Sequence, residues 1–381
     1  MIKKSAYKML LILIIGQLLQ GCDISQSSDN TIYEIFPKNE SLKHSKVRIS
    51  EALTPSSIHL VNDIVVLIDK NLDYSIRFYE ISNWSLKGKY GRRGDGPAEM
   101  QRPKFHGQYI LSKNETNLWF SDIRSYKLKK ISLEKMIGDI NTEPELTHTL
   151  PPELALAYKD VFSISDDEFV GTIEGDIIGL SGDPNAGRFF QFSGKDIKWT
   201  PNFPKQDLEV PQEKVGYLYS SRSAFNNNTQ QLASAMLYYD RIDIMDFRSH
   251  EVLTVMSNDK SKLKEVDLRD DHSLIPPDTK HYYIGAYGTE NYFYCLYAGT
   301  TTQQARDFID GNNSEYPNLQ LHVFDWKGNP IYKAHLDKWT LPSFFIDEKS
   351  WKLYAIDGMP EEEEEVIISY DLPNLLDEKN Q

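Results

Sequence analysis

Cysteine and histidine are scarce in this chain, and neither occurs in a known catalytic or metal-binding pattern. Among 381 residues there are two cysteines and nine histidines. The motifs His-Glu-x-x-His, Gly-x-Ser-x-Gly and paired Cys-x-x-Cys are absent, which removes sequence support for a zinc protease, a hydrolase elbow and a zinc ribbon. Because two cysteines allow at most one disulfide, a fold of this size must be held together by its apolar core.

The chain also has fewer basic than acidic residues. The chain has 42 lysines and arginines against 56 aspartates and glutamates, which gives a net charge of −14. Since no basic patch offsets this charge, we expect no nucleic-acid partner. Hydrophobic residues make up 40% and aromatic residues 12% of the chain, with 22 tyrosines. This composition excludes a disordered chain and favours strands.

The sequence also lacks an apolar run long enough to cross a bilayer. The N-terminal run Met9–Ile15 is interrupted by Gly16 and Gln17, whereas a membrane-spanning helix needs about 20 apolar residues. Three lysines precede this run, which is the pattern of a secretory signal peptide. We therefore assign residues 1–21 to a signal peptide and residues 22–30 to a short polar tether.

The end of this segment, Leu19-Gln20-Gly21-Cys22, resembles the bacterial lipobox. The resemblance implies that Cys22 is the lipid attachment site and that the mature protein is a membrane-anchored lipoprotein. More than one acyl chain gives firm anchoring, because each buried methylene contributes about 0.8 kcal/mol. The alternative is an ordinary cleaved signal with an incidental cysteine. Asp23 directs inner-membrane retention in some bacteria only, so we expect a cell-envelope location, with the protein anchored in the outer membrane on its periplasmic or exterior side.

One strand-like pattern recurs along the rest of the chain: an apolar residue, two residues of any kind, a second apolar residue and then usually Asp, Glu or Ser. Successive copies lie 46 to 79 residues apart. The copies are Ile76–Glu80, Leu128–Ser132, Phe189–Ser193, Ile242–Asp246, Leu321–Asp325 and Ile367–Asp371. In most copies a second strand-like run lies upstream, and turn residues follow several of them.

Six such units predict an all-β fold, a six-bladed β-propeller over residues 31–375 with a C-terminal tail at 376–381. A two-sheet sandwich followed by a second β domain is the alternative, but it does not explain six similar copies. We expect Thr31–Phe36 or Val47–Ile49 to pair with the last blade near Val366–Tyr370 and close the ring. Two stretches are predicted to be long irregular loops, 299–318 and 201–228, and loops on a rigid ring are frequent recognition sites.

A glycine-rich segment, Gly88–Pro103, resembles the G-x-x-G-x-G-P-x-E-[FM]-x-x-P turn of NHL-like six-bladed propellers. The run from Val323 to Ile356 is similar to TolB-like propeller lipoproteins of bacterial envelopes. The resemblance implies a six-bladed fold and an envelope location, and no catalytic residue can be transferred from it. Independently, Gly91, Gly94 and Gly96 favour a tight reversal between blades. A phosphate loop would need a Lys-Ser/Thr ending and a following helix.

Several residues and clusters are candidates for catalytic or metal-binding sites, and each has a simpler structural explanation. Cys295 is expected to be a buried, inert thiol. The acids in Asp166–Glu168 and in Arg269–His272 fit solvated turns better than catalytic pairs. Asp310–Glu315 lacks the glycine of a calcium loop, and Glu361–Glu365 reads as an exposed hairpin. Arg93-Gly94-Asp95 spells an adhesion tripeptide by coincidence. We predict no catalytic, cofactor-binding or metal-binding residue.

Two classes of function remain. In the first, the anchored propeller is a binding or scaffolding module for a protein, peptide or glycan. In the second, it is a lactonase-like hydrolase or lyase with a metal held in the central channel by residues from different blades. The absence of catalytic motifs favours the first class.

Overall fold

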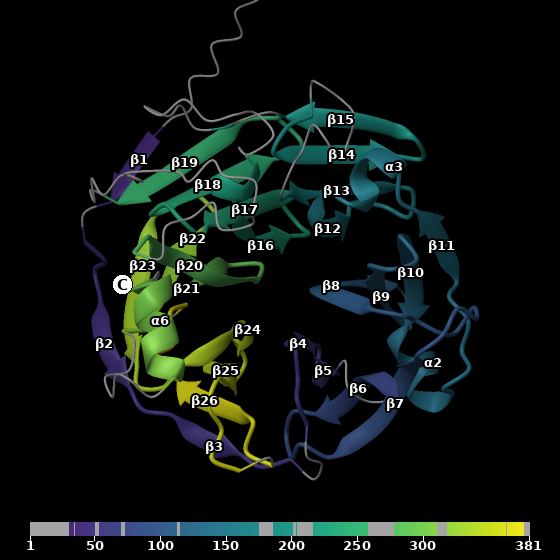
Figure 1. Ribbon diagram of the computed structural model, residues 1–381, viewed down its shortest axis with the longest axis horizontal. Helices are drawn as coiled ribbons and strands as arrows, with labels where there is room; N and C mark the ends of the chain where they lie inside the picture. The colour runs from purple at the N-terminus through teal and green to yellow at the C-terminus, as the bar shows by residue number, and fades with distance from the viewer. Residues whose placement is uncertain are drawn as a thin grey trace, which may run out of the picture.

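The computed structural model describes residues 30–33, 35–49, 53–69, 73–112, 115–174, 186–200, 203, 216–257, 278–310, 318–362 and 364–376. These residues form six β-sheets, arranged as blades around a common axis (Figure 1). The helices α2 (Leu133–Gly138), α3 (Pro152–Ala155) and α6 (Thr302–Ile309) lie between strands. No helix in the described ranges is long and apolar enough to span a bilayer.

Blades 1 to 3 are four-stranded and antiparallel, and each follows the chain from the innermost to the outermost strand. Blade 1 consists of β4 (Ser57–Val61), β5 (Ile64–Ile68), β6 (Tyr74–Glu80) and β7 (Leu86–Arg92). Blade 2 consists of β8 (Pro103–Ser112), β9 (Glu115–Asp122), β10 (Lys127–Ser132) and β11 (Leu146–Thr149). Blade 3 consists of β12 (Tyr158–Ser163), β13 (Glu168–Ile173), β14 (Phe189–Ser193) and β15 (Asp196–Thr200).

Blades 4 to 6 each take one further strand from the N-terminal segment. Blade 4 consists of β16 (Ser221–Asn226), β17 (Gln231–Met236), β18 (Arg241–Asp246), β19 (Val252–Ser257) and β1 (Asn30–Tyr33). Blade 5 consists of β20 (Lys280–Gly288), β21 (Tyr292–Thr301), β22 (Gln320–Asp325), β23 (Pro330–Leu336) and β2 (Asn39–Leu42). Blade 6 consists of β24 (Thr340–Asp347), β25 (Lys352–Asp357), β26 (Ile367–Asp371) and β3 (Ser45–Val47).

The six copies of the sequence pattern are the third strands of the six blades: β6, β10, β14, β18, β22 and β26. This confirms the predicted six-bladed propeller. A third strand lies inside its sheet and between two neighbouring blades, so residues on both of its faces are buried. In β6, for example, five consecutive residues from Ser75 to Tyr79 are buried.

The core is divided among the contacts between neighbouring blades. Phe78 of blade 1 packs in one cluster with Phe105 and Phe120 of blade 2. The cluster that joins the last blade to the first contains Tyr354 and Phe345 of blade 6 and Tyr79 of blade 1. Burial of each such side chain contributes about 1.5–3 kcal/mol, so blade-to-blade packing is the main source of stability.

The N-terminal segment closes the ring. β3 pairs antiparallel with β26 as the outermost strand of blade 6, with Val47 opposite Ile367. This confirms the second of the two predicted closures. The first segment pairs elsewhere: β1 runs parallel to β19 of blade 4. In Figure 1 the N-terminal strands follow the outside of blades 4, 5 and 6.

The prediction that residues 299–318 and 201–228 form irregular loops is partly wrong. Residues Thr302–Ile309 form α6, which begins with a capping box between Thr301 and Gln304. In the second stretch, Ser221–Asn226 form β16, the innermost strand of blade 4. The remainder of these stretches lies mostly outside the described residues.

The glycine-rich segment makes the connection from blade 1 to blade 2, as predicted for a reversal between blades. Gly91 has a φ of +72°, which favours glycine. The Glu99 side chain accepts a hydrogen bond from the Gly96 N–H at 2.9 Å. A Cβ atom on Gly94 would stand 2.0 Å from the Glu99 carboxylate, so a side chain there would displace Glu99 from its position in this turn.

Candidate functional site: the central channel

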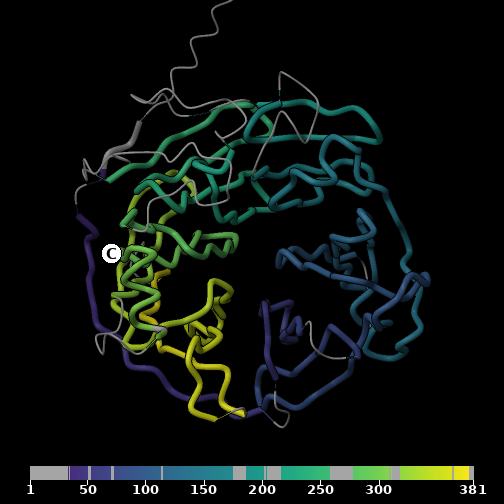
Figure 2. Tube along the Cα trace, in the orientation of Figure 1, coloured from purple at the N-terminus to yellow at the C-terminus, as the bar shows by residue number. Residues whose placement is uncertain are grey.

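A cavity of about 650 Å³ opens on the axis of the ring. It is lined by the C-terminal ends of the six innermost strands and by the turns that follow them, and we call it the funnel. Residues from all six blades contribute to its wall. The ends of β8 and β20 project toward the centre of the ring from opposite sides (Figure 2).

Side-chain amides fix the wall of the funnel in blades 2, 3 and 4. The Gln108 side chain donates to the Ser163 carbonyl at 2.5 Å and accepts from the Ser163 N–H at 2.6 Å. It also donates to the Asn227 side-chain oxygen at 2.7 Å. Asn227 in turn donates to the Tyr109 carbonyl at 3.2 Å. Because Asn227 belongs to blade 4 and Tyr109 to blade 2, these hydrogen bonds connect blades 2 and 4, which are not neighbours in the ring.

A carboxylate fixes the opposite part of the wall. Glu348 of blade 6 accepts hydrogen bonds from three groups of blade 5: the Thr289 hydroxyl at 2.6 Å, the Tyr294 hydroxyl at 2.8 Å and the Asn291 amide at 3.1 Å. Lys349 pairs with Asp63 at 2.7 Å and so joins blade 6 to blade 1. These contacts connect neighbouring blades along the wall.

The lining combines aromatic rings with uncharged polar groups and a few acids. Tyr109 and Tyr287 come from the projecting ends of β8 and β20, and burial raises the pKa of both phenols. The rings of Phe162 and Phe225 stack at 5.0 Å. Glu290, Asp347 and Glu348 outnumber Lys349 in the lining, which makes this end of the channel acidic.

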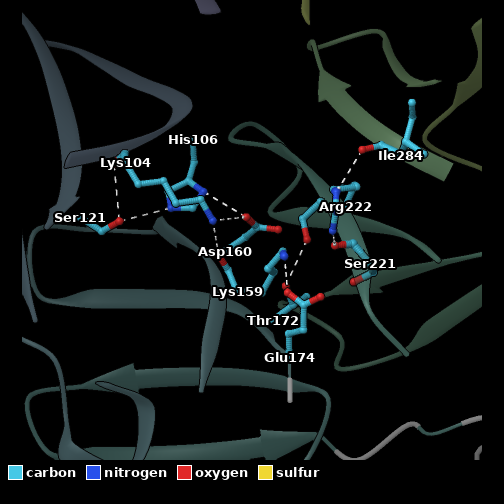
Figure 3. Close-up of polar contacts among 11 residues, drawn as sticks. Lys104, His106, Ser121, Lys159, Asp160, Thr172, Glu174, Ser221, Arg222 and Ile284 are labelled. Carbon is cyan, nitrogen blue, oxygen red and sulfur yellow. Dashed lines mark hydrogen bonds and ion pairs between the residues drawn. The ribbon is translucent and has the colours of Figure 1, made fainter. Parts of the chain in front are cut away.

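A network of charged side chains lies near the starts of the innermost strands β8, β12 and β16 (Figure 3). Asp160 lies 3.1 Å from the Lys104 ammonium and 3.2 Å from His106 Nδ1. Burial alone would raise the pKa of Asp160, but Lys104 and His106 hold it well below its usual range. Lys159 pairs with Glu174, and burial together with the nearby Arg222 lowers the pKa of Lys159.

Arg222 joins blades 4 and 5 in this network. Its Nε donates to the Ile284 carbonyl at 3.0 Å, and its Nη1 donates to the Ser221 carbonyl at 3.0 Å. Within the described residues it makes no ion pair with a carboxylate. Within this network the three cations, Lys104, Lys159 and Arg222, outnumber the two carboxylates, Asp160 and Glu174.

Ser121, His106 and Asp160 lie in an order that resembles a catalytic triad. His106 Nδ1 contacts Asp160, and the Ser121 hydroxyl lies 3.5 Å from His106 Nε2. However, Ser121 is only 1% exposed. Its hydroxyl also donates a hydrogen bond to the Lys104 carbonyl at 3.5 Å. A nucleophile must reach its substrate, so this buried serine does not meet the geometric requirement for acyl transfer.

The other candidate residues are not brought together at one site. Cys295 is fully buried in β21, where burial raises its pKa and keeps the thiol protonated. Asp166 lies in an exposed turn and pairs with Lys130 at 2.7 Å. Cys22, Arg269–His272 and the 311–315 part of the calcium-like loop lie outside the described residues. The described part of the chain contains no group of three His, Cys, Asp or Glu side chains placed to hold a metal ion.

The described residues of the Glu361–Glu365 run lie in the hairpin between β25 and β26, which confirms the predicted place. Several of these acids pair with basic residues of the N-terminal segment. Lys46 contacts Glu361 at 2.9 Å and Glu365 at 2.7 Å, and Arg48 contacts Glu364 at 3.1 Å. The acidic run therefore helps to hold the closing strand.

These features define a six-bladed β-propeller with a funnel on its axis. The sequence matches the TolB-like 6-blade propeller-like family over residues 31–349, and the chain belongs to this family. No curated protein matches the sequence.

Two solved structures from Bacteroides share the fold. One is a member of the DUF4221 family from Bacteroides vulgatus, with 13% identity and a TM-score of 0.55 over 88% of this chain and 98% of that one. The other is a Bacteroides fragilis protein described as exported, with 11% identity and a TM-score of 0.51 over 90% of this chain and 98% of that one. At these identities the likeness concerns the fold alone.

Proposed function

We propose that this protein is a lipoprotein of the bacterial cell envelope whose propeller binds a ligand in the funnel. The observation that carries the proposal is a rigid cavity built from all six blades, with amides, aromatic rings and acids on its wall. Binding sites are usually preformed concave pockets with a small number of placed polar groups. A buried serine and the lack of a metal-binding cluster among the described residues give the enzymatic alternative less support.

The lining favours an uncharged ligand with many hydroxyl groups, that is, an oligosaccharide. Amide and carboxylate side chains can pair with hydroxyls, and the rings of Tyr109 and Tyr287 offer flat apolar surface. The acids of the lining disfavour anionic ligands. A peptide is the other outcome that the experiment below can distinguish.

The envelope location is supported by the lipobox-like Cys22 and by the similarity in fold to an exported Bacteroides protein. Replacement of the attachment site tests it directly. In the Cys22→Ser variant the lipid cannot be attached, so the protein should move from the membrane fraction to the soluble fraction. Retention of the variant in the membrane fraction would contradict lipid anchoring.

Thermal unfolding tests the binding function. The chain from Asp23 onward retains every described residue, and we would unfold it against panels of neutral oligosaccharides and peptides, with and without a chelator. A ligand at 100 times its Kd should stabilise the fold by about 2.7 kcal/mol. An oligosaccharide class that raises the unfolding midpoint supports the proposal. If only peptides raise the midpoint, the ligand is a peptide and not an oligosaccharide. A midpoint lowered by chelator alone supports the metal-dependent alternative.

Two variants locate the binding. Tyr109→Ala and Glu290→Ala should each weaken binding at least tenfold, because both side chains belong to the funnel. Lys327→Ala, in an exposed turn outside the funnel, should leave the affinity unchanged. Equal affinity in all three variants would place the ligand elsewhere.

A further inference from the structure

A second cavity, of about 490 Å³, lies where blade 1 connects to blade 2, and three arginines line it. These are Arg93 of the glycine-rich turn, Arg102 just before β8, and Arg124 in the turn after β9. We call this cavity the arginine pocket. The arginine pocket is lined by the start of β8, whereas the funnel is lined by the C-terminal part of this strand. The two cavities therefore lie on opposite faces of the ring.

The backbone around the arginine pocket is fixed by one buried carboxylate. Asp122 is 2% exposed. It accepts hydrogen bonds from the N–H groups of Gln101 at 3.1 Å, Arg102 at 2.9 Å and Arg124 at 3.4 Å. The Ile123 N–H also donates to the Arg102 carbonyl at 3.1 Å. These bonds hold Arg102 and Arg124 side by side on the rim.

Two of the three arginines in the arginine pocket carry positive charge that no described carboxylate pairs with. Arg102 and Arg124 are exposed, and neither forms an ion pair with a described residue. In the neighbouring turn the Asp95 carboxylate accepts from the Gln101 amide and the Glu99 carboxylate accepts from the Gly96 N–H, and neither acid forms an ion pair with Arg102 or Arg124. In a chain of net charge −14, two guanidinium groups on one cavity without an ion-pair partner among the described residues are a local exception.

We propose that the arginine pocket binds a phosphate group. Guanidinium groups present planar forks of N–H donors that match phosphate oxygens, and several forks can share one phosphate. The Ser75 hydroxyl and the Gln101 amide line the same cavity and can donate further hydrogen bonds. The phosphate can belong to a small soluble molecule or to a lipid headgroup. This site is independent of the ligand proposed for the funnel.

Calorimetric titration with inorganic phosphate and with a sugar phosphate tests the proposal on the chain from Asp23 onward. Flotation with vesicles of phosphatidylglycerol, against vesicles of phosphatidylcholine, distinguishes a lipid source from a soluble one. We expect saturable binding in at least one arm, weakened at least tenfold in Arg102→Gln and in Arg124→Gln. The variants Lys327→Gln and Tyr109→Ala should bind as the unmodified chain does.

The proposal fails if neither phosphate nor anionic vesicles bind. It also fails if Arg102→Gln and Arg124→Gln bind as tightly as Lys327→Gln, because the interaction is then a response to overall charge. Both arginine side chains are exposed, so these variants should keep the unfolding midpoint of the unmodified chain. Loss of oligosaccharide binding in Tyr109→Ala with phosphate binding retained would show that the two sites are separate.

Discussion

Arg188 and Asp243 form an ion pair in the interior, between blades 3 and 4. Their side chains are 1% and 0% exposed. Asp243 also accepts from Thr254 at 2.7 Å and from Arg241 at 2.9 Å, and Arg188 donates to the Ser234 hydroxyl at 2.7 Å. A charge buried this deeply requires its partner, since removal of one member leaves the other charge uncompensated.

Replacement of this arginine should therefore be costly. We expect Arg188→Met to lower the free energy of unfolding by about 3–5 kcal/mol, measured by denaturant titration. The matched control is Lys349→Met, because the pair of Lys349 with Asp63 is exposed at the surface. That change should cost less than about 1 kcal/mol. Similar losses in the two variants would contradict the structural role of the buried pair.

Asp240 is a second buried acid, and its titration makes stability depend on pH. It accepts hydrogen bonds from Ser257, from Tyr283 at 2.8 Å and from Tyr33 at 3.1 Å. Burial nevertheless raises the pKa of its carboxyl. A raised pKa contributes stability that is fully present below the unfolded-state pKa, about 3.9, and is lost as pH rises through the folded-state pKa.

Asp240→Asn removes this titration. The free energy of unfolding of the variant, relative to the unmodified chain, should therefore increase as the pH rises above about 4 and then level off. Denaturant titrations of both proteins across this range measure the difference, in which all other titrating groups cancel. Two parallel curves would show that Asp240 does not titrate as described.

The funnel could not be predicted from the sequence, and its residues show why. Asn227 and Asn62, which also lines the funnel, are ordinary turn formers, and the same residue type is common in solvated loops. Their role comes from the ring, which brings together segments more than 100 positions apart, such as Gln108 and Asn227. The arginine pocket has a shorter span: Arg93 and Arg102 belong to the glycine-rich segment, and only the pairing of β8 with β9 brings Arg124 beside them.

Among the structural elements, the innermost strands β20 and β24 are in close contact at a glycine. Gly285 of β20 lies against the Pro342 carbonyl of β24, and a Cβ atom would stand 2.1 Å from that oxygen. We expect Gly285→Ala to destabilise the protein by about 1–3 kcal/mol, because blades 5 and 6 must separate to admit the methyl group. Gly138→Ala at the end of α2 is the control, since no atom lies within 4 Å of its added Cβ.

Thermal and denaturant unfolding of both glycine variants measure this effect. An alanine that is tolerated equally well at both positions would mean that blades 5 and 6 adjust freely. A loss confined to Gly285→Ala would identify the contact between innermost strands as a fixed part of the ring.

The third strand of each blade could be predicted from the sequence, whereas the innermost strands could not. The reason is that the two kinds of strand have different surroundings. A third strand is covered on both sides by neighbouring blades, so it is apolar at most positions, as in β6. An innermost strand faces the channel. The polar sequence of β16, which contains Ser221, Arg222 and Ser223, therefore looked like a loop. For α6 a signal was present, since Thr301 and Gln304 have the spacing of a capping box.

At the scale of the whole molecule, the ring is closed by a short strand held partly by charge. Lys46 of β3 meets two acids of the Glu361–Glu365 run. Lys46→Glu would set like charges against each other at this contact. We expect a lower unfolding midpoint at low ionic strength, and a smaller difference in about 1 M salt, where the Debye length is about 3 Å.

The same charge change elsewhere is the control. Lys327→Glu, in an exposed turn of blade 5, should leave the midpoint nearly unchanged at both salt concentrations. If the two variants behave alike, the closing strand depends on its backbone pairing and not on the acidic run.

The closing contacts also have a consequence for synthesis. Tyr33 meets Asp240 across 207 positions, and Lys46 meets Glu361 across 315. Because a chain emerges from its N-terminus first, β1 to β3 are made before the strands with which they pair. β1 must wait for β19, β2 for β23 and β3 for β26. A chain cut short anywhere before β26 retains a β3 that has nothing to pair with. Closure of the ring thus reports that synthesis has passed β26.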